Sequence, residues 1–253
     1  MRLFDTHSHL IDARFDSDRE AVIASLEKKN VKRVVDVGCT LSEAEKVKNL
    51  IEGNSFIYGA CGIHPHNVGG LTMRDIDALR GFYAHKKMIA VGEIGLDYHY
   101  DFAPRETQKK WFAVQLELAA ELDLPVILHI REAYGDALSI LEAQKGKLRG
   151  IMHCFSGSLE TAFNCLDLGL YIAFGGAITF KNAKRAAEIA YSMPEDRLLI
   201  ETDCPYMTPE PFRGKRNDPS LVTLVNKRMA EIRGVEAETM AEITYQNGLR
   251  AFK

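Results

Sequence analysis

Two histidines near the start of the chain, His7 and His9, are spaced so that both could bind one metal ion. They end a short apolar run, residues 3–9. In an extended strand, side chains two residues apart point to the same face, so the two imidazoles would lie side by side. Two histidines with this spacing often occur in proteins without binding a metal. Here, however, later apolar runs end in the same way. The residues at their ends are further metal-binding side chains: Glu93, His129, His153 and Asp203.

The number of these side chains indicates more than one ion. Four imidazoles and two carboxylates exceed what one tetrahedral ion needs, so we expect two divalent ions that share a carboxylate. Imidazoles suit Zn²⁺ or Mn²⁺ and carboxylates suit Mg²⁺, which leaves the identity of the metal open. Taken singly, the carboxylates could be turn or strand-end residues, and the later histidines could be core residues. Their coincidence at four different strand ends favours the metal interpretation.

These residues are far apart in sequence, so the fold must bring distant strand ends together. Eight apolar, often β-branched runs predict strands, and amphipathic or capped segments between them predict helices. The predicted strands are residues 3–9, 31–38, 56–63, 88–95, 125–129, 149–155, 171–176 and 198–203. Such alternation is typical of a parallel sheet covered on both faces. Eight units in 253 residues predict a single-domain (β/α)8 TIM barrel over residues 1–253, with its active site at the C-terminal strand ends.

An open, doubly wound sheet is the alternative fold. It typically carries a glycine-rich nucleotide-binding turn after its first strand. Here Thr6-His7-Ser8-His9 stands at that position and contains no glycine. The barrel is therefore the favoured prediction.

Composition limits the partners and the location of the protein. Apolar residues make up 46% and charged residues 26%, which is ordinary for a globular protein. The net charge of −3 speaks against bulk polyanion binding, although it allows a local basic rim. An odd five cysteines with no CxxC pair, no signal peptide and no long apolar run predict a cytoplasmic protein without membrane contact. No dimerisation signature or obligate protein partner is evident, so we expect a monomer.

Several motifs follow one another along the chain. They are FDTHSHL (residues 4–10), GIHPH (62–66), VGEIGLDY (91–98), PVILHIR (125–131), HCFSG (153–157), ETDCPY (201–206) and RGKRNDP (213–219). In this order they closely resemble the TatD family of metal-dependent hydrolases, within the wider amidohydrolase-like barrels. The resemblance implies a (β/α)8 barrel, Mg²⁺-dependent deoxyribonuclease activity, and metal positions at the six residues named above. Other amidohydrolase-like barrels use a modified lysine on the fourth strand, where this chain has Glu93.

The expected mechanism divides these residues between two ions. His7, His9 and Asp203 would hold one ion, and Glu93 would bridge it to the other. The second ion would be held by the remaining imidazoles, His129 and His153. Bound ions would lower the pKa of a water molecule and neutralise a phosphate oxygen. Asp203 could accept the proton of that water as a general base or, because it also binds metal, mainly orient the water.

A phosphodiester substrate would also need cations beside the metal ions. Arg131 lies two residues past His129, so in a strand both face the same way. Three more cations lie in the loop after the eighth strand, where they could bind phosphate or simply be solvated: Arg213, Lys215 and Arg216. His64 ends the third strand and could contact substrate, support a metal ligand or sit in a plain turn. Aromatic side chains after the fourth strand could stack on bases, although packing beneath the rim is favoured: Tyr98, His99 and Tyr100.

The leading hypothesis is a two-metal deoxyribonuclease that hydrolyses phosphodiester bonds of DNA, acting as an exonuclease on single-stranded ends. The alternative is a metal-dependent amidohydrolase or esterase acting on a small molecule or an aminoacylated RNA. The local cations favour phosphate, whereas the acidic net charge favours a small substrate. A third hypothesis, a non-catalytic barrel with structural metal only, is disfavoured by the surplus of carboxylates. The choice between DNA and RNA and the polarity of attack stay open.

Overall fold

Eight apolar runs form eight parallel strands that pair in chain order. The computed structural model covers residues 1–253. Its strands are β1 (Leu3–Ser8), β2 (Val31–Gly38), β3 (Ile57–Cys61), β4 (Met88–Asp97), β5 (Val126–Arg131), β6 (Gly150–Met152), β7 (Leu170–Phe174) and β8 (Leu198–Ile200). The strand order β1-β2-β3-β4-β5-β6-β7-β8 confirms the predicted (β/α)8 barrel.

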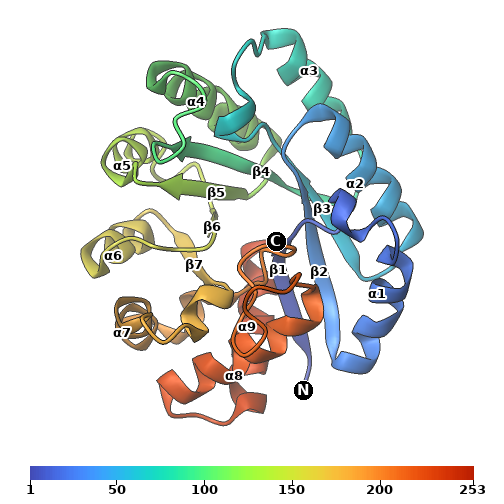
Figure 1. The fold of residues 1–253 in the computed structure, drawn as a ribbon. Coiled ribbons are helices and arrows are strands. Elements are labelled where there is room, and N and C mark those ends of the chain that lie inside the picture. The colour runs from blue at the N-terminus through green and yellow to red at the C-terminus, as the bar shows by residue number, and fades with distance from the viewer.

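Helices cover the outside of the strands (Figure 1). The α-helices are α1 (Arg19–Leu26), α2 (Leu41–Gly53), α3 (Met73–Phe82), α4 (Arg105–Leu122), α5 (Tyr134–Glu142), α6 (Leu159–Asp167), α7 (Lys184–Ser192), α8 (Val222–Arg233) and α9 (Ala237–Ala251). Thr72 and Asp75 form a capping box at the start of α3, which satisfies free backbone amides at that helix end. None of these helices is long and apolar enough to cross a membrane.

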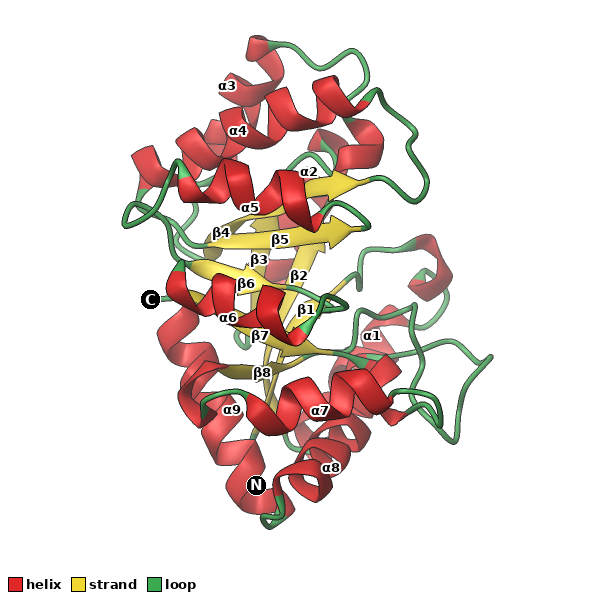
Figure 2. Ribbon diagram, turned by 90° about the vertical axis from the view of Figure 1, so that its left-hand side faces the viewer, coloured by secondary structure: helices red, strands yellow, loops and turns green.

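The C-terminal segment packs against the barrel at the end away from the arrowheads of the strands (Figure 2). There the ring of Phe252 lies 5.7 Å from that of Phe4, and the ring of Tyr245, on α9, lies 6.1 Å from Phe4. All strands are parallel, so their C-terminal ends gather at the opposite end, where loops rather than core side chains meet.

The junction between β1 and β8 is built differently from the other seven, which are parallel ladders. The buried Asp5 carboxylate on β1 accepts hydrogen bonds from the Thr202 amide at 2.8 Å and the Thr202 hydroxyl at 2.6 Å. The Thr6 hydroxyl donates to the carbonyl of Ile200 at 3.1 Å. Side-chain hydrogen bonds from Asp5 and Thr6 therefore help to close the barrel.

Three strand ends differ from the prediction in ways that affect the site. β4 continues through Asp97, two residues beyond the predicted end, whereas β6 and β8 stop at Met152 and Ile200. Cys154 and Asp203 have φ values of 42° and 56°, in the left-handed region that an extended strand does not allow. The side chains after β6 and β8 are thus carried by loops that turn at the mouth of the barrel.

Replacing Asp5 by Ala should destabilise the protein, because the amide and hydroxyl of Thr202 would lose their buried acceptor. Each unsatisfied donor costs about 1–3 kcal/mol, so we expect the free energy of unfolding to fall by about 3 kcal/mol. Urea unfolding followed by circular dichroism would measure the change.

Two further variants test the assignment of this loss to hydrogen bonding. Asp5→Asn keeps one acceptor oxygen and should cost less than Asp5→Ala. Asp77→Ala, on the exposed side of α3, should leave the free energy of unfolding within about 0.5 kcal/mol of wild type. Equal stability of the Asp5→Ala and Asp77→Ala proteins would show that closure does not depend on this carboxylate.

Candidate metal centre

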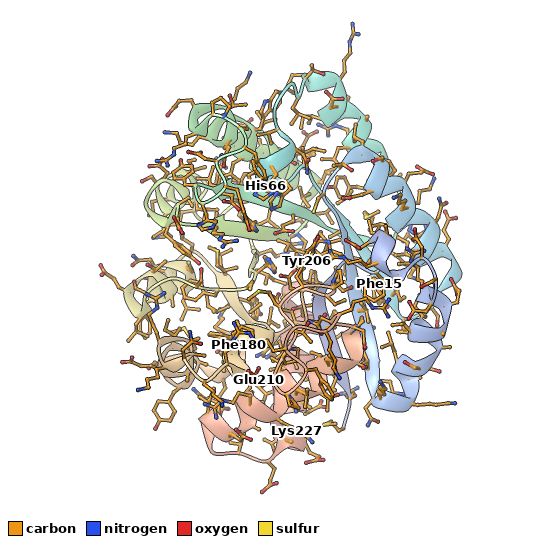
Figure 3. All side chains as sticks on the ribbon, in the orientation of Figure 1. Phe15, His66, Phe180, Tyr206, Glu210 and Lys227 are labelled. Atoms are coloured by element: carbon orange, nitrogen blue, oxygen red, sulfur yellow. The ribbon has the colours of Figure 1, made fainter.

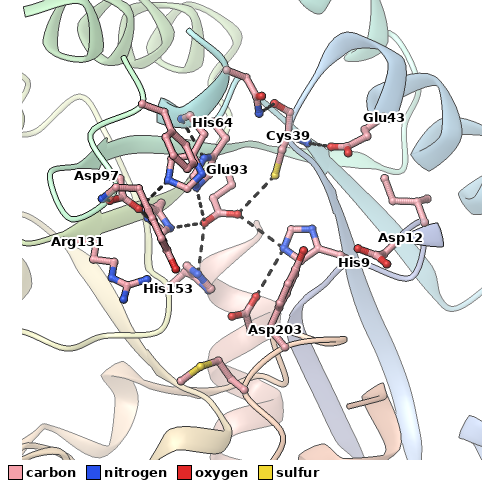
Figure 4. Close-up of a pocket in the computed structure, with 18 residues that line it drawn as sticks. His9, Asp12, Cys39, Glu43, His64, Glu93, Asp97, Arg131, His153 and Asp203 are labelled. Atoms are coloured by element: carbon pink, nitrogen blue, oxygen red, sulfur yellow. Dashed lines mark hydrogen bonds and ion pairs between the residues drawn. The ribbon is translucent and has the colours of Figure 1, made fainter. Parts of the chain in front are cut away.

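The Glu93 carboxylate lies at the centre of a cluster of imidazoles at the mouth of the barrel (Figure 4). Its side chain is 5% exposed. Atom Oε2 lies 3.5 Å from His7 Nε2 and 3.7 Å from His9 Nε2. Atom Oε1 faces three other imidazole nitrogens, at 2.7 Å from His129 Nδ1, 3.4 Å from His153 Nε2 and 3.6 Å from His64 Nε2. A carboxylate whose two oxygens face different imidazoles is suited to being shared by two cations.

Closure of the barrel brings Asp203 against the first strand. Its amide donates to the carbonyl of His7 at 2.9 Å, and the amide of His9 donates to the carbonyl of Cys204 at 2.8 Å. Asp203 Oδ1 therefore lies 3.6 Å from His9 Nε2 and 3.9 Å from His7 Nε2. The first strand and the loop after the last strand thus supply one side of the cluster.

Three of the imidazoles have their outward nitrogen beside a fixed acceptor. His9 Nδ1 lies 2.9 Å from a backbone carbonyl of β2, and His129 Nε2 lies 3.0 Å from Asp97 Oδ2. His153 Nδ1 lies 2.9 Å from Glu201 Oε1, although the contact is not aligned as a hydrogen bond. When the outward nitrogen carries the proton, the inward nitrogen presents its lone pair to the centre. Metal-binding histidines are oriented in this way.

The electrostatics of the cluster favour a cation. Burial raises the pKa of Glu93, but the charges of His153 and His64 hold that pKa well below its usual range. Burial lowers the pKa of His9, but Asp203 and Glu93 outweigh it and raise the pKa to about 9. The carboxylates are therefore ionised and hold protons on neighbouring imidazoles. A divalent cation would be attracted by the same carboxylates and would displace those protons.

The donor set fits a divalent metal. Ligand atoms within 4.8 Å of one another form three overlapping groups: His7–His153–Asp203, His7–His9–Glu93 and His64–Glu93–His129. In addition, His7 Nδ1 is buried without a hydrogen-bond partner. All six expected ligands belong to these groups, but the grouping differs from the expected one. His129 is grouped with His64, whereas His153 is grouped with His7 and Asp203.

Two residues that the sequence analysis did not assign complete one side of the cluster. The buried Asp97 carboxylate lies between two imidazoles, with Oδ2 3.0 Å from His129 Nε2 and 2.9 Å from His66 Nε2. Asp97 lies four residues after Glu93 on β4, and His66 lies two residues after His64. Even spacing places residues of a strand on one face, so this signal could have found Asp97.

The cluster forms the floor of an open cavity of about 580 Å³. Arg131 lines this cavity, as expected (Figure 4). None of the three expected loop cations lines it: Arg213, Lys215 and Arg216. Arg216 instead binds both carboxylate oxygens of Asp18, at 2.8 and 2.6 Å, and the Arg213 guanidinium lies 4.3 Å from the centre of the Phe180 ring. These contacts give two of the loop cations a structural role.

The chain is similar along its length to known proteins. The family model described as TatD related DNase matches residues 4–253. The chain is 44% identical to the metal-dependent hydrolase YabD of Bacillus subtilis, over 99% of both chains. It is 32% identical to the 3'-5' ssDNA/RNA exonuclease TatD of Pantoea ananatis, again over 99% of both. A solved structure of YJJV, a TatD homologue from Escherichia coli, has a TM-score of 0.94 at 31% identity, covering 99% of this chain and 98% of that chain.

Replacing Glu93 by Gln should weaken metal binding, because it removes the central negative charge while keeping the size of the side chain. We expect dialysed protein to retain clearly less Zn²⁺ or Mn²⁺ than wild type, with affinity reduced about tenfold or more. Elemental analysis by mass spectrometry and titration with a metal-sensitive dye would measure this.

Glu132→Gln is the matched control, since Glu132 is exposed and contacts His99 at 2.8 Å outside the cluster. Its metal content should equal that of wild type. If Glu93→Gln retained the wild-type metal content and affinity, the centre of the metal site would lie elsewhere.

Proposed function

The chain belongs to the TatD related DNase family of metal-dependent hydrolases, and from this premise we propose that it is an exonuclease for single-stranded DNA. The proposed substrate bond is the phosphodiester near a free end of the strand. The observation that carries this proposal is the Glu93 carboxylate, whose oxygens face different imidazoles at the floor of an open cavity. The name of the Pantoea relative, an exonuclease for single-stranded DNA and RNA, supports the same substrate class.

The metal would be held by the six side chains at the mouth of the barrel: His7, His9, Glu93, His129, His153 and Asp203. We propose two divalent ions, with Glu93 between them. When bound, such ions lower the pKa of water and neutralise charge on a phosphate oxygen. His64 lies 3.6 Å from Glu93 Oε1 and would orient that carboxylate or contact the substrate.

Asp203 is the candidate general base. Its side chain is 15% exposed and lines the cavity, so it can reach a water molecule there. Burial raises the pKa of Asp203, but His9 and His153 hold it below its ordinary value, so the carboxylate is ionised and can accept a proton. Arg131 would face a phosphate oxygen from the other side of the cavity.

The second candidate function is hydrolysis of an amide or ester in a small molecule or an aminoacylated RNA. One observation favours it, namely the acidic lining of the cavity. Five carboxylates line it, against the single guanidinium of Arg131: Asp12, Glu43, Glu93, Asp97 and Asp203. An uncharged small molecule would avoid the resulting repulsion of phosphate, so the acidic lining favours the small-molecule substrate and not the aminoacylated RNA.

End-labelled single-stranded DNA distinguishes the two functions. We expect the wild-type protein to shorten the oligonucleotide in the presence of Mg²⁺, Mn²⁺ or Zn²⁺. Addition of EDTA should stop this cleavage. Asp203→Asn should lower kcat about a hundredfold or more, because it removes the proton acceptor. Labels on the 3' and 5' ends, resolved on a sequencing gel, give the rate and the direction.

Asp77→Asn, which changes an exposed carboxylate on α3, is the control and should cleave like wild type. Equal cleavage by wild type and Asp203→Asn would point to a contaminating nuclease. No cleavage by metal-loaded wild type, together with hydrolysis of a p-nitrophenyl ester or an aminoacylated RNA, would replace the proposal by the second function.

A further inference from the structure

Two exposed aromatic rings stack on each other at the rim of the cavity. Tyr100 and Phe102 follow β4 and are 50% and 68% exposed, and both line the cavity. Their ring centroids are 5.4 Å apart with planes 23° apart, an offset stack. The expectation that the aromatic residue at position 100 packs beneath the rim is therefore wrong, because its ring stands in solvent. We call this pair the aromatic platform.

Neighbouring groups hold the aromatic platform in place. The ring of His66 meets both rings edge-on, at 5.3 Å from Tyr100 and 4.8 Å from Phe102. Asp97 anchors it from below, since its carboxylate accepts from the Tyr100 amide at 2.9 Å and contacts His66 Nε2 at 2.9 Å. The Arg131 guanidinium lies 5.0 Å from the centre of the Tyr100 ring. A surface held in this way loses little freedom when a ligand binds to it.

The aromatic platform is close to the proposed reaction centre. One imidazole, His66, separates it from His129, with ring centroids 6.2 Å apart. His129 Nδ1 in turn lies 2.7 Å from Glu93 Oε1. His66 and Tyr206, both labelled in Figure 3, line the same cavity. A group bound to the platform would thus sit next to the bond that is cut.

Location and stacking together distinguish the aromatic platform from other exposed rings. Tyr206 also lines the cavity and is 48% exposed, but it stacks on no aromatic ring and only meets His9 edge-on. Phe163 on α6 and Tyr191 on α7 are 44% and 66% exposed, but neither lines the cavity nor stacks on another aromatic ring. Isolated exposed rings of that kind are ordinary on protein surfaces. A stacked pair with a guanidinium at the mouth of a catalytic cavity resembles the surfaces that bind unpaired bases.

We propose that the Tyr100–Phe102 platform binds one unpaired base of a single-stranded nucleic acid, adjacent to the phosphodiester bond that is hydrolysed. This proposal rests on the proposed function and specifies how that site selects single strands. A base inside a duplex is stacked on both faces and paired with the other strand. A terminal base has one free face but is still held in its pair, so an unpaired base can lie on Phe102 and continue the stack far more readily. Every base has an aromatic face, so the site would select single strands with little sequence preference.

The test combines variants of the protein with variants of the oligonucleotide. A decanucleotide is prepared with an abasic site at each position in turn from the end that is attacked. In wild type, removal of one particular base should raise KM about tenfold, the loss expected for one stacked base. In Tyr100→Ala/Phe102→Ala the intact oligonucleotide should show this raised KM, and the abasic site should have no further effect.

Four variants separate stacking from structural damage. Tyr100→Phe and Phe102→Trp keep a stacking ring and should retain the dependence on that base. Phe163→Ala and Tyr191→Ala, which remove remote exposed rings, should have wild-type KM. A raised KM in the double variant that stays sensitive to the same abasic site would overturn the proposal, because the base would then be bound elsewhere.

Binding without catalysis keeps this test independent of the proposed function. Fluorescence anisotropy of a labelled decanucleotide with phosphorothioate linkages, which resist hydrolysis, should show on the metal-loaded protein the same loss of about tenfold in affinity on abasic substitution, and only in proteins that keep the platform. If wild type hydrolyses no oligonucleotide, the proposed function fails, and anisotropy still decides whether the platform binds a base. Binding that is insensitive to every abasic site would overturn the platform itself.

Discussion

The metal centre depends on the closure of the barrel between its first and last strands. Asp5 accepts hydrogen bonds from Thr202 across this junction, and a little further along the chain on each side the amide of Asp203 donates to the carbonyl of His7 at 2.9 Å. Two candidate metal ligands at the start of the chain, His7 and His9, thereby meet a third, Asp203. These hydrogen bonds are buried, so removal of one partner would leave the other group without water or a partner and would destabilise the fold. Stability and site geometry are set by the same contacts.

The cluster around Glu93 illustrates why a buried charge needs several partners. A carboxylate 5% exposed would lose most of its hydration, and this cost is offset by the surrounding imidazoles. Those imidazoles are themselves held from outside, by Asp97 behind His129 and by Glu201 behind His153. The outer carboxylates fix which nitrogen faces inward. The same pairing of an imidazole with an outer carboxylate therefore recurs at His129 on β5 and at His153 just after β6.

The sequence was sufficient to predict the barrel and to name six side chains that the fold brings together, because each lies at or just after an apolar run and parallel strands end at one mouth. It was insufficient for the contacts between loops. Asp97 was missed because β4 extends past Gly95, where the glycine suggested an end. The cations of the loop after β8 were expected at the substrate. Arg216 instead forms an ion pair with Asp18, which is nearly two hundred residues away in the sequence, so residue spacing could not predict this contact. Side-chain partners across loops depend on tertiary structure, and short-range patterns do not encode them.

An acidic mouth and a polyanionic substrate are compatible if binding does not depend mainly on protein cations. The cavity offers one guanidinium, so most of the positive charge that meets phosphate would have to come from bound divalent ions. That charge acts at the cleaved bond and contributes little to binding the rest of the strand. Stacking on Tyr100 and Phe102 contributes affinity without charge, and it acts on the part of the nucleotide that a duplex hides. Weak attraction for the phosphate backbone then favours single strands, because double-stranded DNA offers the site phosphates but, apart from the outer face of a terminal pair, no unstacked base.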